Sequence, residues 1–211
     1  MSLPTYRGFP VLDWSPDISD PSGAFEFRSG RNMVDGYAGP LRYDQPAQAR
    51  PRTARTLRYL LESRADLLTA RTFLRETAAG RLRGFWVPMW AEDLHLSATM
   101  LAGSASLVIT RIGYAKFYSG AGLGREHVAV FPHIANTGPL LTCRKITAAS
   151  ATDATETLSL DAAVGNDLTV DDLVCFLFFS RADDDKLVLT WETMVHGTLE
   201  IPLLDLPTET P

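Results

Sequence analysis

The sequence predicts a mainly β protein with one α-helix. After residue 80 the chain consists of short segments rich in β-branched and aromatic residues, separated by Gly, Asn and Asp. Before residue 80, one segment has the apolar spacing and end signals of a helix. No helix recurs between the later segments, which argues against a parallel doubly wound sheet and favours a sandwich or barrel.

The expected strands are short, and their spacing is typical of sandwiches and barrels. In the first part of the chain, residues 23–29 and 52–61 alternate between two faces. Residues 182–186, with three consecutive aspartates, are expected to form a hairpin connection. The later strands are expected at 83–88, 92–97, 105–112, 126–132, 139–146, 156–160, 173–180, 186–194 and 197–204.

The helix is expected over residues 64–79. Ser63 and Asp66 have the spacing of a capping box, in which the serine hydroxyl accepts from the Asp66 amide. Apolar residues follow at helical spacing, and Gly80 is well placed to end the helix in a left-handed conformation.

Both ends of the chain are expected to be irregular. Prolines at positions 4, 10, 16, 21, 40 and 46 each remove a backbone donor. This pattern predicts a wrapping N-terminal arm, and residues 206–211 are expected to trail over the surface.

Composition excludes several classes of protein. The 211 residues are 45% apolar and 21% charged, values typical of a globular protein with its own core. The net charge of -5 disfavours nucleic acid as a partner. The longest apolar run, Leu173 to Phe179, is far shorter than the roughly 20 residues of a membrane helix. The N-terminus has no pattern of a secretory signal, so folding in a cytosol is expected.

The sequence identifies no catalytic, cofactor-binding or metal-ligating residue. The four histidines are dispersed, and Asp183 to Asp185 lack the glycine and distal glutamate of a calcium loop. Gly120 to Gly124 precede a strand-like run rather than a helix, so they are interpreted as a loop. Cys143 and Cys175 lie in apolar runs and are expected to stay buried and reduced. A hydrolase with dispersed carboxylates stays open, with no pair to name.

Residues 83–94 form the most informative stretch, because they concentrate Phe85, Trp86 and Trp90 around Pro88. The first interpretation is a core strand, with Phe85 and Trp90 buried against the helix. A sugar-binding platform and a subunit interface are the alternatives.

Arginines are concentrated between residues 50 and 83, where nine occur and lysine is absent. Arginine suits fixed protein interfaces because its planar group forms bidentate ion pairs, although a GC-rich genome explains the bias equally well. The candidate interface residues are Arg52, Arg55, Arg58, Arg71 and Arg75.

The order of these features resembles the minor tail proteins of long-tailed phages. The resemblance is carried by Pro51-Arg52-Thr53-Ala54-Arg55, by a helix ending in Thr72 to Gly80, and by Gly84-Phe85-Trp86-Val87-Pro88-Met89-Trp90 with Asp93 following. The sequence is most similar to the distal tail protein group, including the related proteins of gene transfer agents. The resemblance covers about residues 50–95.

The resemblance implies a fold and a function. It implies a β-sandwich ring domain with one α-helix, formed by residues 1–98 and 186–211, plus a smaller β-barrel-like part at 99–185. The expected function is a non-enzymatic structural subunit of the virion's tail tip or baseplate, assembled in the bacterial cytoplasm. The expected partners are further copies in a hexameric ring, the tail tube protein, and the hub or other tail-tip proteins, without cofactor, nucleic acid or membrane. The alternative function is a carbohydrate-binding β-sandwich module in which Trp86, Trp90 or Trp191 stacks on sugars.

Overall fold

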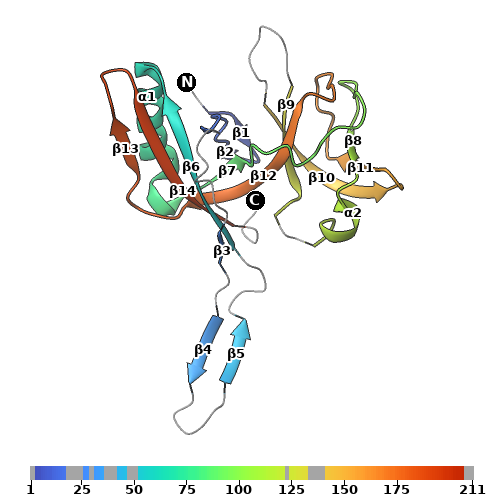
Figure 1. The fold of residues 1–211 in the computed structure, drawn as a ribbon, viewed down its shortest axis with the longest axis horizontal. Coiled ribbons are helices and arrows are strands. Elements are labelled where there is room, and N and C mark those ends of the chain that lie inside the picture. Colours follow the sequence, from blue (N-terminus) through green and yellow to red (C-terminus); the bar gives the residue numbers. More distant parts are fainter. Residues whose placement is uncertain are drawn as a thin grey trace.

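The fold is mainly β with one principal helix, as the sequence predicts (Figure 1). The computed structural model describes residues 3–17, 26–28, 31–35, 42–46, 52–121, 124–132 and 141–206. Its largest sheet has ten strands in the order β3-β6-β14-β12-β9-β10-β11-β8, with β13 added beside β14 and β7 beside β12.

One half of the molecule contains the helix and the strands beneath it. Figure 1 shows α1 at one end of the body, next to the strands that pair with β14. The strands of this half are β3 (Glu26–Arg28), β6 (Arg52–Leu61), β7 (Gly84–Pro88), β13 (Val188–Trp191) and β14 (Gly197–Asp205).

The other half contains the strands that lie between β7 and β12 in the sequence. A short helix, α2 (Tyr114–Phe117), lies beside them. The strands are β8 (Ser106–Thr110), β9 (His127–Phe131), β10 (Thr142–Ala151) and β11 (Thr155–Leu160).

Strand β12 (Leu173–Ala182) joins the two halves. Its first residues, 173–176, pair with β9, whereas residues 177–181 pair with β7 and residues 180–182 pair with β14. It is almost wholly buried, as expected for an apolar strand that is covered on both faces. The division into residues 1–98 plus 186–211 and residues 99–185 stays a prediction, and β12 pairs across it.

Two small sheets lie outside this large one. β1 (Thr5–Tyr6) and β2 (Phe9–Pro10) form the start of the N-terminal arm. The arm continues along β7, where the Leu12 amide donates to the Trp86 carbonyl oxygen at 2.8 Å. β4 (Arg31–Asp35) and β5 (Arg42–Pro46) pair antiparallel with each other.

The predicted helix is present but changes its winding. Its capping box forms as expected, with the Ser63 hydroxyl accepting from the Asp66 amide at 3.1 Å. α1 covers Arg64–Thr72, and the chain then continues as a π-helical segment over Phe73–Ala78 and a short 3-10 turn over Gly80–Leu82. Ala79 is the first left-handed residue, followed by Gly80, so the chain reverses one residue earlier than predicted.

Two other expectations were wrong. Residues 92–97 form no strand, only an isolated bridge from Leu96 to Ile109. Residues 182–186 do not connect a hairpin, because β14 lies between β12 and β13. The hairpin is formed by β13 and β14, joined through residues 192–196.

Candidate interaction surface

The predicted core motif lies on β7, in the interior. Phe85, Trp86 and Pro88 are buried there. Phe85 packs against Phe73 below the helix, and the Trp86 indole N–H donates to the Tyr6 carbonyl oxygen at 3.0 Å. Trp86 therefore fastens the N-terminal arm and has no surface for stacking on a sugar.

Trp90 does not pack against the helix, which corrects the sequence prediction. It is half-buried and lies against Phe131 of β9, with ring centroids 4.6 Å apart. Trp90 has a left-handed backbone with φ of 60°, so the chain turns away from β7 immediately after the strand. None of the described residues accepts a hydrogen bond from its indole N–H.

Asp93 follows at the same corner. The amide of Phe176 lies 3.5 Å from its carboxylate, and burial raises the pKa of Asp93 above its ordinary value. Asp93 lies between the end of β7 and strand β12, where the two halves of the molecule meet, and this position indicates a structural role.

The candidate arginines divide into interior and surface residues. Arg55 is buried, with its guanidinium 3.8 Å from Asp205 and over the ring of Phe178. This burial argues against a contact between Arg55 and another subunit. Arg58 is half-buried, whereas Arg71 and Arg75 are exposed on the helical segment. The side chain of Arg52 lies outside the described residues.

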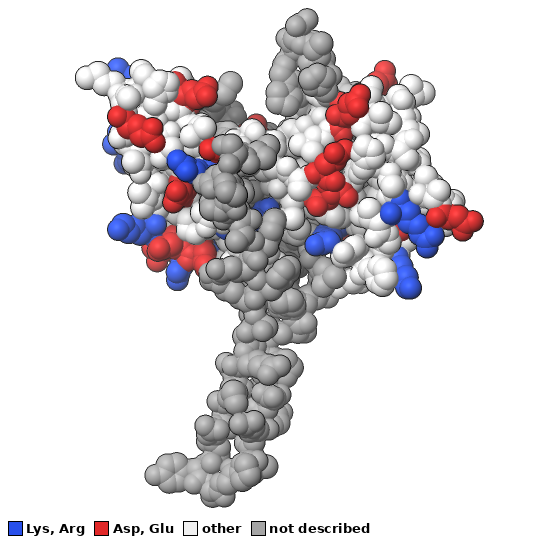
Figure 2. Space-filling model, viewed as in Figure 1, with Lys and Arg blue, Asp and Glu red and all other residues white. Residues whose placement is uncertain are grey.

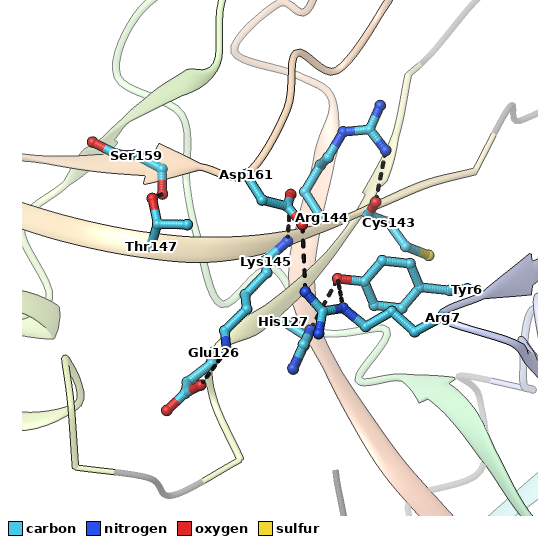
Figure 3. A network of polar contacts seen from close by, with 10 residues as sticks. All are labelled: Tyr6, Arg7, Glu126, His127, Cys143, Arg144, Lys145, Thr147, Ser159 and Asp161. Atoms are coloured by element: carbon cyan, nitrogen blue, oxygen red, sulfur yellow. Dashed lines mark hydrogen bonds and ion pairs between the residues drawn. The ribbon is translucent and has the colours of Figure 1, made fainter. Parts of the chain in front are cut away.

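A polar network joins the N-terminal arm to β9, β10 and the end of β11 (Figure 3). The Tyr6 hydroxyl lies 3.0 Å from Nδ1 of His127, and Arg7 forms an ion pair with Asp161 at 3.6 Å. Burial, reinforced by the charges of Arg7 and Lys145, lowers the pKa of His127 to about 4. The imidazole is therefore neutral at pH 7 and acts as part of the packing.

The most prominent exposed apolar feature lies on the outer side of α1. Arg64, Leu68 and Arg71 recur at positions i, i+4 and i+7, so they share one helix face. Leu68 is 54% exposed, although Leu67 and Ala70 on the opposite face are buried. The helix thus presents an apolar residue between two cations to solvent.

The β13–β14 loop completes this face as a groove of about 520 Å³. Trp191 is 54% exposed and Met194 is 90% exposed. Met and Trp are among the side chains that dominate protein contacts. We call this feature the α1 groove, lined by Arg64, Leu68, Arg71, Trp191, Glu192, Thr193 and Met194.

The strand beside the groove has a free edge. Among the strands that the structure describes, β13 pairs with β14 alone. Val188 and Trp191 are exposed on it. A free edge with exposed apolar side chains invites association unless a partner covers it, so this end of the body has two features of an interface.

The rest of the described surface carries charged residues of both signs. On the face in Figure 2, basic and acidic side chains are intermixed in the left half, whereas in the right half several acidic side chains form a row above most of the basic ones. No group of three or more His, Cys, Asp or Glu residues within the described ranges could hold a metal ion. No helix in those ranges is long and apolar enough to cross a membrane.

Comparison with known proteins adds no family to this description. No protein-family model matches the chain, and no curated protein matches it at a significant level. The interpretation of the α1 groove as an interaction surface therefore depends on the structure alone. Arg71 and Trp191 were separate candidates in the sequence, and only the fold brings them to one groove. The apolar residues Met194 and Val195, directly after β13, were the available signal.

Proposed function

We propose that the protein is a structural subunit of a phage tail tip or baseplate, a ring-forming distal tail protein. In this role it links the tail tube to the hub and the receptor-binding components of the virion. The expected assembly is a ring of six copies, formed in the bacterial cytoplasm, and the protein has no catalytic activity.

The observation that carries this proposal is the exposed α1 groove beside the free edge of β13. Leu68, Trp191 and Met194 are exposed to water around one groove at this end of the body. Such an area, rimmed by charged residues, is typical of a surface that another protein covers. A subunit of a permanent assembly needs a surface of this kind.

The position of the motif at 84–90 adds support. Phe85 and Trp86 fasten the helix and the N-terminal arm to the same strand. Residues of this motif therefore join the helix, β7 and the N-terminal arm in one packed unit, and we expect each copy in a symmetric ring to present the same surfaces.

A second candidate function is a carbohydrate-binding module, which the exposure of Trp191 favours. Of the three tryptophans that could stack on sugars, Trp86 is buried and Trp90 is half-buried. Trp191 is open to solvent beside Glu192 and two arginines, and a flat aromatic ring next to polar groups is a suitable sugar platform.

The ring proposal is tested on assembled tails. A density map of the tail tip should contain this chain in a closed ring around the tail axis. A location off the axis, as a lone decoration or a trimeric fibre, would overturn the proposal.

The two candidates are separated by Trp191→Phe in the purified protein. Sugar binding predicts that a glycan panel shifts the tryptophan emission of the native chain and that the variant loses the shift. The tail subunit predicts no glycan response in either chain, and protection of Trp191 from iodide once the protein is assembled.

A further inference from the structure

We propose that the α1 groove of one copy receives Leu101 of the next copy. This inference rests on the proposed ring function, because it names the two surfaces that meet between neighbouring subunits. It assigns the groove one occupant, a second copy of this chain.

Leu101 is a preformed apolar knob. Its side chain is 72% exposed at a turn between residues 100 and 104. Met100 and Leu168 exchange both backbone hydrogen bonds, at 2.8 and 2.9 Å. The Ala102 amide also donates to the Asp167 carboxylate at 2.8 Å. The turn is therefore held from two sides, so little ordering entropy is lost when Leu101 is covered.

The α1 groove offers a matching apolar surface. Its apolar lining comes from Leu68, Trp191 and Met194. The groove has a volume of about 520 Å³ and is open to solvent, so these apolar side chains are accessible to a second copy. An exposed leucine and an exposed aromatic groove on the same chain each lose unfavourable contact with water when they meet.

The charges beside the two surfaces are complementary. The segment 165–172, which runs beside the Leu101 turn, carries exposed Asp167 and Asp171. Arg64 and Arg71 flank the apolar part of the groove, against a single acid, Glu192. Aspartates meeting arginines across a contact fix its register and disfavour a groove-to-groove pairing, which would oppose like charges.

The two surfaces lie in different halves of the molecule. Each copy can therefore contact one neighbour through its groove and another through Leu101. The groove is built on α1 and β13, whereas the Leu101 turn immediately precedes β8 in the other half (Figure 1). A contact between two different surfaces is head-to-tail, and it closes into a ring when the rotation per copy divides a full turn.

The first experiment introduces cysteines at both surfaces of the full-length chain. Leu101→Cys with Met194→Cys should form disulfide-linked ladders under mild oxidation at high protein concentration. The native Cys143 and Cys175 are buried and serve as an unreactive background. Each single variant should give no ladder, and a Met194→Cys chain that dimerises fully would indicate groove-to-groove pairing and overturn the inference.

The second experiment mixes two blocked chains. Leu101→Asp removes the knob and keeps the groove, whereas Met194→Asp spoils the groove and keeps the knob. Neither should self-associate, but their mixture should form a dimer and nothing larger, as measured by sedimentation velocity. Leu82→Asp is the matched control, because Leu82 is 87% exposed and lies in neither surface.

The outcomes separate this inference from the proposed function. Rings without a ladder would overturn the Leu101 contact and leave the ring subunit standing. A ladder with open chains in place of rings would support the contact and count against the ring subunit. A chain that stays monomeric and forms no ladder overturns the inference.

Discussion

Phe85 of β7 meets Phe73 of the helical segment edge-on, with ring centroids 5.2 Å apart and planes at 83°. Edge-to-face contacts of this kind add to the free energy of burying the rings. The contact places β7 under the helical segment and confirms the prediction that Phe85 is buried against it.

We predict that Phe85→Ala lowers the free energy of unfolding by about 3–5 kcal/mol, because it leaves a cavity beneath the helix. Chemical denaturation measures the loss. Leu82→Ala is the control and should change stability by less than about 0.5 kcal/mol, since Leu82 is exposed. A similar loss in both variants would mean that Phe85 is not a core residue.

A second prediction concerns the two thiols. Burial raises the pKa of Cys143 to about 12 and that of Cys175 to about 11. Because the thiolate is the reactive form, neither cysteine should react with a thiol reagent at pH 8 in the native protein. Both should react after denaturation, and rapid labelling of the native chain would contradict their burial.

Much of the β fold was predictable because local patterns and tertiary burial agree. Alternation identified β6, an apolar run identified β12, and Ser63 with Asp66 identified the helix start. The hairpin assignment failed at Asp183 to Asp185, because turn composition cannot tell which strand comes next to β12. Asp185 is used instead to accept from the Arg81 amide at 3.0 Å, a contact between distant parts of the chain.

The candidate surface was only partly predictable, for a related reason. Periodicity places Arg71 on an outer helix face, but nothing local places Trp191 beside it, since 120 positions separate the two residues. For Arg55, the sequence predicted a surface position that the structure does not show. Its charge suggested a surface, whereas β6 turns it inward to Asp205 and Phe178.

A third prediction concerns Gly197, the first residue of β14. A Cβ at this position would lie 2.7 Å from the Thr190 carbonyl oxygen and 2.8 Å from the Leu67 side chain. Gly197→Val should therefore push α1 away from the sheet and cost about 1–3 kcal/mol of stability. Thermal unfolding measures the cost. Gly103→Ala, where a Cβ meets no atom within 4 Å, should be nearly neutral.

The last prediction concerns the pH dependence of stability at His127. Its pKa is about 4 in the folded chain, against an ordinary value of 6.5. Between these two values the unfolded chain binds a proton that the folded chain excludes, so stability falls as the pH is lowered through this window. His127 contributes at most about 1.4 kcal/mol per pH unit to the slope of the unfolding free energy against pH.

His127→Gln isolates this contribution, because glutamine retains a hydrogen-bonding group toward Tyr6 but does not titrate. The buried carboxylates Asp93 and Asp205 have raised pKa values, which act in the opposite direction, but they are common to both chains. The difference in unfolding free energy, native minus variant, should be constant above pH 7 and decline from about pH 6.5 to 4. Parallel curves over that range would show that folding does not lower the pKa of His127.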